Sequence, residues 1–352
     1  MEIKADLIKK IYDLMQDDIS REVFYNRLLF EITNDENFIK KMIFTNDSIK
    51  GFISRLEREK NKKKIIFGAG KRGRQLYNLF PNVKWYCFVD NYNMGYEVEN
   101  LSVIGFNEFK AISNNALVCI TPKNGYHDIY NQLIEVGVNR NDILNYQTAL
   151  ADFENPYFES FFLHDDNEIF IDAGVYDGNT TIQFREWSND NYNQVYMFEP
   201  SVEYFKRYAG KFNKMKNVEW IKKGLWSKST NLLLFQRPDS DISVEENLSG
   251  LGEDYLYKNG TWTKIPVVSL DEKIGNKKIT FLKMDIEGAE LEAIRGSKSI
   301  LSKYKPKLAI CVYHKKGDLL NIPNEILNIN PNYKFYMRHK SYDTLDTILY
   351  GV

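Results

Sequence analysis

The chain has 352 residues, 43% of them hydrophobic and 27% charged, with 47 Lys and Arg against 48 Asp and Glu. This length exceeds one ordinary core and suits two α/β domains of roughly 150 residues each. The net charge of −1 provides no bulk attraction for nucleic acid or an anionic membrane, so we expect neither as a partner.

The pattern also argues against secretion and membrane insertion. The first residues, "MEIKADLIKKIYDLMQ", carry a charge every few positions. No apolar run approaches the roughly 18 residues that a membrane span needs. Cys87, Cys119 and Cys311 are scattered through apolar, strand-like runs, which predicts buried free thiols rather than disulfides or metal ligands. We therefore expect a cytoplasmic protein.

The first half of the chain divides into a helical segment and a small α/β domain. Residues 1–58 show helical periodicity with breaks at "TNDEN" and "TNDS", whose residue types suit helix N-caps. Residues 59–150 alternate strands such as "KIIF", "WYCFVD" and "ALVCIT" with helices, which predicts a parallel, Rossmann-like sheet. Pro156 and an acidic cluster within 152–168 mark the expected joint with a third domain, 151–352.

The second half restarts the alternation of strands and helices. It runs from "EIFIDAG" to a terminal pair, "YKFYMRH" and "TILYGV", that would fold back antiparallel. The pattern predicts a seven-stranded α/β sheet. The polar stretch 236–254, "QRPDSDISVEENLSGLGED", is either a substrate lid or a long loop.

The first glycine turn, Gly68 to Gly73, follows a strand and precedes a helix, and Asp90 ends the next strand. This is the context of the dinucleotide-binding fingerprint. Gly68 and Gly70 would let backbone N–H groups approach a pyrophosphate, and Lys71 adds positive charge. The alternative is that these glycines only permit a tight turn in a domain that binds nothing. The residues favour neither interpretation.

The second glycine turn has different chemistry because it begins with an acid, Asp172. A carboxylate repels a pyrophosphate but suits a cofactor that carries an ammonium and a sulfonium, such as S-adenosylmethionine, and Gly174 and Gly178 leave room for it. The next strand ends in Glu199, which we expect to accept hydrogen bonds from both ribose hydroxyls. Farther along, Trp226 and the backbone before it are expected to flank adenine.

Acids and histidines follow the later strands. Asp285 ends the buried run "ITFLKM", and Glu287 comes two residues later. These groups would act as a general base, orient a hydroxyl, or hold a divalent cation together with His314. His314 and His339 each end a predicted strand, and we assign both to catalysis with Asp285 and Glu287. We expect no resident metal ion.

Four stretches, "FIDAGVYDGNTT", "MFEPSVEYF", "ITFLKMDIEGAELEAIRGS" and the closing "TILYGV", resemble the FkbM family of S-adenosylmethionine-dependent methyltransferases. The resemblance covers roughly residues 150–352 and implies a class I methyltransferase fold that O-methylates a sugar or polyketide hydroxyl. The residues expected to bind the cofactor are Asp172, Gly174, Tyr176, Gly178, Thr180, Glu199, Pro200, Ser201, Gly224, Leu225 and Trp226.

The expected function is O-methylation of a sugar or glycan hydroxyl in surface polysaccharide or natural-product biosynthesis. The acceptor would be a small molecule, a glycan or a nucleotide-linked sugar, and a homodimer is the common default assembly. Two alternatives stay open. One is an NAD-dependent oxidoreductase that uses the turn from Gly68 to Gly73, and the other is a scaffold without catalysis in a glycan assembly complex.

Overall fold

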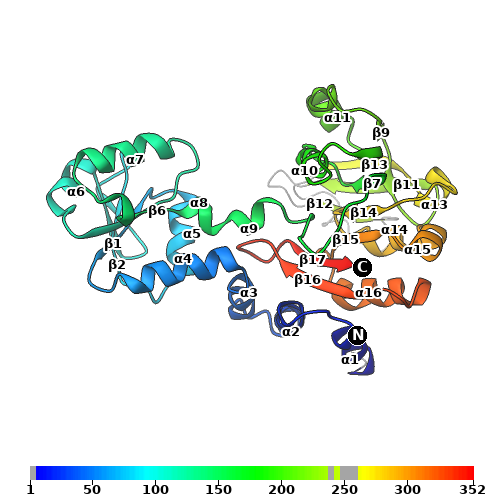
Figure 1. The fold of residues 1–352 in the computed structure, drawn as a ribbon, viewed down its shortest axis with the longest axis horizontal. Coiled ribbons are helices and arrows are strands. Elements are labelled where there is room, and N and C mark those ends of the chain that lie inside the picture. The colour runs from blue at the N-terminus through cyan, green and yellow to red at the C-terminus, as the bar shows by residue number, and fades with distance from the viewer. Residues whose placement is uncertain (1–4, 237–241, 246–260) are drawn as a thin grey trace. The chain divides into compact units, whose positions relative to one another are not determined.

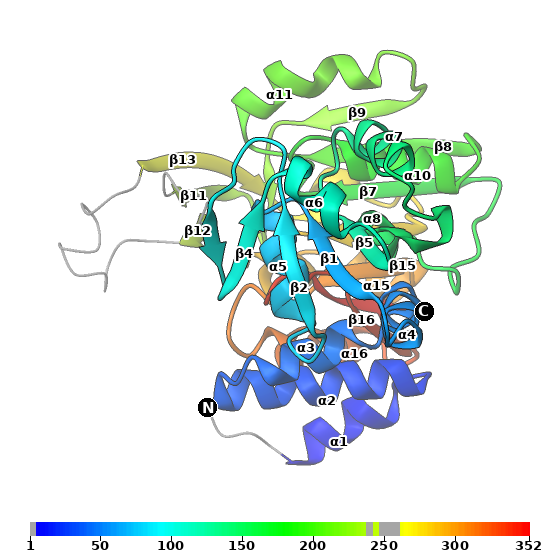
Figure 2. The same cartoon turned by 90° about the vertical axis from the view of Figure 1, so that its left-hand side faces the viewer.

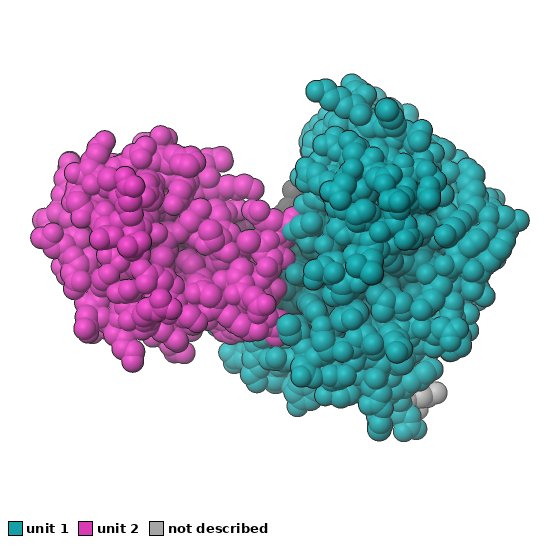
Figure 3. All heavy atoms as spheres, in the orientation of Figure 1, with its two compact units in different colours: residues 1–42, 155–352 teal, residues 43–154 magenta. Residues whose placement is uncertain are grey.

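The structure is a computed structural model that describes residues 5–236, 242–245 and 261–352. The chain forms two compact units, one made of residues 1–42 and 155–352 and the other of residues 43–154 (Figure 3). The boundary at 154 lies close to the predicted joint. The division at 42 differs from the predicted boundary at 58, because the first two helices pack with the C-terminal half of the chain.

The unit of residues 43–154 contains a six-stranded sheet in the order β3-β4-β2-β1-β5-β6. Its pairs are parallel except for β3 and β4, which are antiparallel. The strands are β1 Lys63–Phe67, β2 Trp85–Val89, β3 Tyr96–Val98, β4 Leu101–Ile104, β5 Ala116–Ile120 and β6 Ile143–Asn145. The helices are α4 Asp47–Arg58, α5 Lys71–Leu79, α6 Phe106–Ile112, α7 Tyr126–Glu135, α8 Tyr146–Ala149 and α9 Ala151–Glu154.

The main sheet of the larger unit has seven strands in the order β16-β17-β15-β14-β7-β8-β9 (Figure 1). β17 runs antiparallel between β15 and β16, and the other pairs are parallel. The seven-stranded α/β fold predicted from the sequence is thereby confirmed. The strands are β7 Glu168–Ala173, β8 Tyr192–Phe198, β9 Val218–Ile221, β14 Phe281–Met284, β15 Lys307–Cys311, β16 Phe335–His339 and β17 Thr347–Gly351.

Helices connect these strands because a parallel pair needs a crossover. They are α10 Asn179–Trp187, α11 Val202–Tyr208, α13 Leu270–Ile274, α14 Glu290–Arg295, α15 Lys298–Tyr304 and α16 Asp318–Ile329. The core beneath them is rich in aromatic rings. Phe170 and Phe184 stack with centroids 4.3 Å apart, an arrangement that adds about 0.5–1.5 kcal/mol to their burial. The high aromatic content therefore serves the core.

A second, four-stranded sheet in the order β10-β13-β11-β12 is inserted between β9 and β14. Its strands are β10 Gly224–Leu225, β11 Thr230–Gln236, β12 Ile242–Glu245 and β13 Thr261–Val268. β9 ends at Ile221, and β10 joins the inserted sheet through its pairing with β13. Most of the stretch predicted to be either a substrate lid or a long loop, residues 237–241 and 246–254, lies outside the described residues.

The N-terminal helices α1 Ala5–Asp13 and α2 Asp18–Thr33 belong to the larger unit. Two views show α2 beside α16 and β16 (Figures 1 and 2). Ser20 of α2 is fully buried, and its hydroxyl accepts a hydrogen bond from the backbone N–H of Met337 at 2.9 Å. α3 Asn37–Ile43 follows these helices.

Two properties expected from the sequence can be checked directly. Cys87, Cys119 and Cys311 are buried and form no disulfide. Among the described residues, none of the helices combines the length and apolar character needed to cross a bilayer.

Candidate functional site

The parallel strands β7, β8, β14 and β15 end at one edge of the main sheet, where open α/β sheets bind their ligands. The turn after β7 is bonded to both of its neighbours. Gly174 N donates to Phe198 O of β8 at 3.0 Å, and Asp285 N donates to Ala173 O at 3.1 Å. The structure therefore brings the predicted cofactor turn and the predicted acceptor-side acids together.

Gly174 is required by this close approach. Its φ is +81°, and a Cβ at this position would lie 1.7 Å from the carbonyl oxygen of Asp285. A side chain would therefore push the loops after β7 and β14 apart. The glycine allows contact within the protein, whereas the sequence suggested that it leaves room for a ligand.

Asp172 lies beneath this turn and is fully buried. Its Oδ1 is 3.1 Å from Lys283 Nζ, and its Oδ2 accepts a hydrogen bond from Thr181 Oγ1 at 2.6 Å. Lys283 also donates to the carbonyls of Ala173 and Gly174. The predicted direct contact between Asp172 and the cofactor ammonium is not supported, because both carboxylate oxygens are engaged inside the protein. Asp172 and Lys283 instead shape the turn.

Glu199 stands at the end of β8, next to the turn. Its carboxylate accepts hydrogen bonds from Tyr176 N at 3.2 Å and Ser201 N at 2.9 Å. Burial raises its pKa, while the two backbone N–H groups oppose that effect. Tyr176 is 59% exposed, has a left-handed φ of 49° and packs edge-on against Tyr204. Glu199 and Tyr176 thus lie together beside the turn, and their binding of a cofactor stays a prediction.

The remaining residues predicted to bind the cofactor lie in two places, one group beside the turn after β7 and the other at the inserted sheet. Pro200 and Ser201 follow Glu199 directly, and Gly178 is the N-cap of α10. Thr180 is half-buried in the first turn of α10, while the neighbouring Thr181 makes the bond to Asp172.

Gly224, Leu225 and Trp226 lie in or beside the inserted sheet, where Gly224 and Leu225 pair with β13. Trp226 is 6% exposed and packs with Leu232, Ile265 and Ala289. An indole in this position is part of a hydrophobic core. The expectation that it flanks adenine is therefore not supported.

Three carboxylates surround the imidazole of His314. Its Nε2 lies 3.4 Å from Asp285 Oδ1 and 3.7 Å from Glu287 Oε2, and its Nδ1 lies 3.0 Å from Glu290 Oε1. Tyr157 donates a hydrogen bond to Asp285 Oδ2 at 2.8 Å. The side chain of Glu287 is the most open of these acids, with 44% exposed. Asp285, Glu287 and His314 thus form one cluster, as predicted.

The charges in this cluster change the expected roles. Burial alone lowers the pKa of His314, but the three carboxylates outweigh it and raise the pKa to about 9. Burial raises the pKa of Glu287 to about 7, and the neighbouring Asp285 adds to this effect. His314 is therefore protonated at neutral pH, which removes it as a general base. Glu287 titrates near neutral pH, where a general base is most effective.

Ligand atoms of Asp285, Glu290 and His314 lie within 4.8 Å of one another, so this group has the residue types of a metal site. The geometry does not fit an ion well. The two carboxylates approach different ring nitrogens of His314, whereas an ion binds only one nitrogen of an imidazole. An imidazolium held between two carboxylates explains the arrangement better.

His339 is fully buried at the end of β16, with Nδ1 3.0 Å from Thr347 Oγ1. Burial and the nearby Arg27 guanidinium lower its pKa to about 3. A neutral imidazole without exposed surface cannot reach an acceptor hydroxyl. The structure therefore argues against the catalytic role expected of His339.

Glu290 and several other residues of the site were not assigned a role from the sequence. Lys283 was visible as a charge inside an apolar strand, and Tyr157 lay in the segment interpreted as a joint. Asp346 precedes β17, and burial together with the charge of Asp285 raises its pKa to about 7. Asp346 and Glu287 both have left-handed backbone, with φ of 46° and 58°. Such strain gathers at functional sites, and this signal is absent from the sequence.

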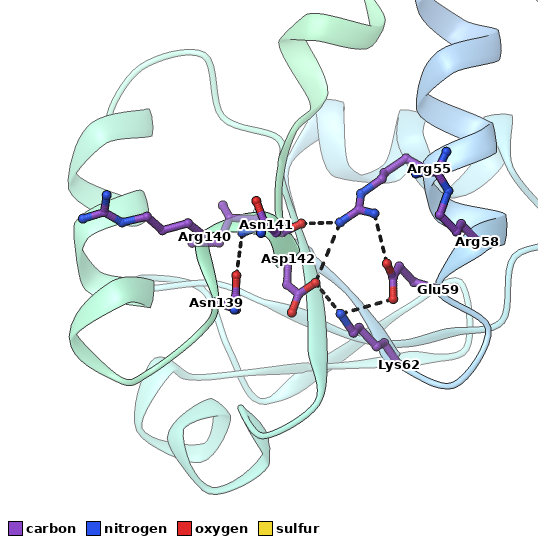
Figure 4. Close-up of a pocket in the computed structure, with 9 residues that line it drawn as sticks. Arg55, Arg58, Glu59, Lys62, Asn139, Arg140, Asn141 and Asp142 are labelled. Atoms are coloured by element: carbon purple, nitrogen blue, oxygen red, sulfur yellow. Dashed lines mark hydrogen bonds and ion pairs between the residues drawn. The ribbon is translucent and has the colours of Figure 1, made fainter.

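The smaller unit contains a polar pocket of about 700 Å³, shown in Figure 4. An ion-pair network crosses it, in which Arg55 contacts Glu59 at 3.0 Å and Lys62 contacts Asp142. The pocket lies near the amino ends of β1 and β6, while the turn from Gly68 to Gly73 follows the carboxyl end of β1. It is therefore separate from the predicted nucleotide turn.

Two family models match the chain. The model "Methyltransferase FkbM domain" matches residues 172–337, and the model "C2185-like, N-terminal" matches residues 60–144. The first match includes Asp172, Glu199, Asp285 and His314. No curated protein matches the chain.

Solved structures give distant matches. A methyltransferase FkbM from Methylobacillus flagellatus KT is 19% identical, with 95% of this chain and 99% of that chain covered and a TM-score of 0.47. A Streptococcus mutans protein in complex with SAH is 16% identical, with coverages of 57% and 94% and a TM-score of 0.30. An rRNA methylase from Streptococcus thermophilus is 14% identical, with coverages of 57% and 91% and a TM-score of 0.31.

Proposed function

We propose, on the premise that residues 172–337 match the FkbM methyltransferase domain, that the chain transfers a methyl group from S-adenosylmethionine to a hydroxyl of a sugar or glycan. The acceptor would be a small molecule, a polymer or a nucleotide-linked sugar of surface polysaccharide or natural-product biosynthesis. A cytoplasmic location agrees with three cysteines that form no disulfide.

The cofactor fits the turn after β7 through residues other than Asp172. Glu199 is 7% exposed and keeps lone pairs beyond the two backbone N–H groups that it accepts, so it suits a ribose diol. Tyr176 offers an exposed ring beside it. When bound, S-adenosylmethionine supplies an activated methyl group, so much of the protein's task is to position the acceptor.

The observation that best supports O-methylation is the partial exposure of the Glu287 carboxyl together with its raised pKa. A hydroxyl must lose its proton as it becomes a nucleophile, and Glu287 has a partly exposed carboxyl whose pKa is raised to about 7. The adjacent His314 imidazolium would stabilise the carboxylate and orient it. Glu287 is thus the base in this proposal, and His314 supports it.

The test combines binding and turnover. Calorimetry should show that the full chain binds S-adenosylmethionine and gives no heat with NAD. A panel of free, nucleotide-linked and polymeric sugars then identifies an acceptor by the release of S-adenosylhomocysteine. Glu287→Gln should lower turnover by roughly 10²–10⁴-fold with unchanged cofactor affinity.

Glu292→Gln is the matched control, since Glu292 lies on α14 and pairs with Arg295 at the surface. It should keep wild-type turnover. If the chain binds NAD but not S-adenosylmethionine, the oxidoreductase alternative replaces this proposal. Binding without turnover on any acceptor would favour the scaffold alternative, and full turnover of Glu287→Gln would remove Glu287 as the base.

A further inference from the structure

Helix α2 contacts two loops at the edge of the main sheet through one buried cation. Arg27 is 4% exposed. Its Nη1 donates to Thr344 O at 2.7 Å and to Thr347 Oγ1 at 3.3 Å, and its Nη2 donates to Tyr313 O at 3.4 Å. A planar guanidinium can bond in this way to groups from two different segments, whereas an ammonium has no such fork.

Glu31 lies one turn farther along α2 and strengthens the same connection. Its Oε1 is 3.5 Å from Arg27 Nε, and its carboxylate accepts a hydrogen bond from the backbone N–H of Gly317. The side chains of Arg27 and Glu31 are only 5% and 13% exposed. The pair is therefore well shielded from solvent, and each partner depends on the other for charge compensation.

The two loops that this pair holds carry residues of the candidate site. Tyr313 immediately precedes His314, and Gly317 follows it by three residues in the loop after β15. Thr344 and Thr347 bracket Asp346 in the loop before β17. The side chains of Arg27 and Glu31 thus hold backbone groups of both loops, each of which carries a residue of the cluster.

We propose that Arg27 and Glu31 are positioning residues that hold the loops of His314 and Asp346 in the arrangement of the site. α2 then completes a site whose other residues lie mostly within residues 172–337, although α2 lies outside that segment. The catalytic meaning of this proposal rests on the proposed function, while the positioning itself can be tested without cofactor or acceptor.

The experiment is a pH titration of the histidine ring signals by NMR on the full chain. The chain has four histidines, and the signal missing from His314→Gln assigns His314. The acidic groups that interact with its ring are Asp285, Glu287, Glu290, Asp318 and Asp346. In the wild type His314 should titrate near pH 9. In Arg27→Gln the loop is released from α2, so the titration should move toward 6.5.

Ser20→Ala is the matched control. Ser20 is also a fully buried polar residue of α2, but it bonds to Met337 and Arg338 rather than to either loop. It should leave the His314 titration unchanged. The same titration midpoint in Arg27→Gln and wild type would overturn the proposal, and so would an equal shift in Ser20→Ala.

If Arg27→Gln does not fold, Glu31→Gln replaces it in the same titration. It keeps the shape of the side chain and removes its charge, and we expect a smaller shift of the His314 titration in the same direction. An unchanged midpoint in Glu31→Gln would then overturn the proposal. Once an acceptor is known, Arg27→Gln should lower turnover by roughly 10²-fold with unchanged cofactor affinity, the cost of a misplacement of about 1 Å.

Discussion

The two glycine turns of this chain share one local fold and differ in what lies beneath them. Each turn joins a parallel strand to a helix, and an acid ends the next strand, Asp90 in one unit and Glu199 in the other. Beneath the first turn, the Thr121 hydroxyl donates to Phe67 O at 2.9 Å. Beneath the second turn, the Lys283 ammonium donates to Ala173 O and Gly174 O.

The two acids also differ in how much hydrogen-bonding capacity remains. Asp90 accepts three backbone N–H groups, from Ala69, Tyr92 and Asn93, all at 3.0 Å. Burial opposes these bonds, yet together they lower its pKa. Glu199 accepts two N–H groups and has a raised pKa. A glycine turn therefore does not specify a function by itself, because the ends of neighbouring strands provide its chemistry.

The largest expected difference between the turns concerns stability. Lys283→Met leaves Asp172 as a buried charge without its partner, which should lower the free energy of unfolding by about 3–5 kcal/mol. Thr121→Val removes a neutral hydroxyl from the first turn and should cost about 1 kcal/mol. Urea denaturation measures both. Equal losses in the two variants would break the comparison.

The charge state of His314 makes the second turn's surroundings sensitive to pH. Its pKa is raised to about 9 from an ordinary value of 6.5, so its contribution to stability is complete below pH 6.5 and is lost as pH rises through 9. At about 1.4 kcal/mol per pKa unit, this difference corresponds to roughly 3–4 kcal/mol. Urea midpoints at several pH values should fall over this window in wild type.

The decline should flatten in His314→Gln and persist in His164→Gln, because His164 is an exposed residue of the same unit. A wild-type stability that stays constant from pH 6.5 to 9 would contradict the imidazolium cluster.

The sequence predicts the elements of this comparison well because they depend on local patterns. Strand periodicity followed by glycine turns predicted β1 and β7, and their positions after strands made Glu199 and Asp285 candidate site residues. Parallel strands end at one edge, so the grouping of Asp285, Glu287 and His314 also followed from the pattern. These features need only the order of residues within a few turns of chain.

The residues that escaped prediction depend on distant partners. Asp172 was assigned to the cofactor from the local turn pattern. Its actual partner, Lys283, is 111 positions away in the sequence, so no local pattern reveals the ion pair. Arg27 lies 286 positions from Tyr313, so nothing local identifies α2 as part of the site. The pKa of His314 depends on three carboxylates that surround it only in the folded chain. No local pattern carries that information.

A smaller effect should distinguish the two strand-end acids in binding. Glu199→Gln keeps the shape of the side chain but weakens its hydrogen bonds to a ribose, so cofactor affinity should fall about tenfold, or about 1.4 kcal/mol. Asp90→Asn should leave that affinity unchanged. Calorimetry with S-adenosylmethionine measures both, with the exposed Glu203→Gln as control. A loss of affinity in Asp90→Asn would contradict the separation of the two turns.

The smallest expected effect concerns Gly70, the position that decides between the two interpretations of the first turn. Its φ of −75° is open to any residue, and a Cβ there would meet nothing within 4 Å. Gly73 differs, since its Cβ would lie 1.9 Å from Gly68 O. Packing explains Gly73 but not Gly70, so Gly70→Ala should change the free energy of unfolding by less than about 0.5 kcal/mol. Calorimetry should show no NAD binding to the wild type, because backbone donors already occupy three of the acceptor sites of the Asp90 carboxylate. If NAD binds and Gly70→Ala abolishes that binding, the glycine serves a ligand and the first turn is a second functional site.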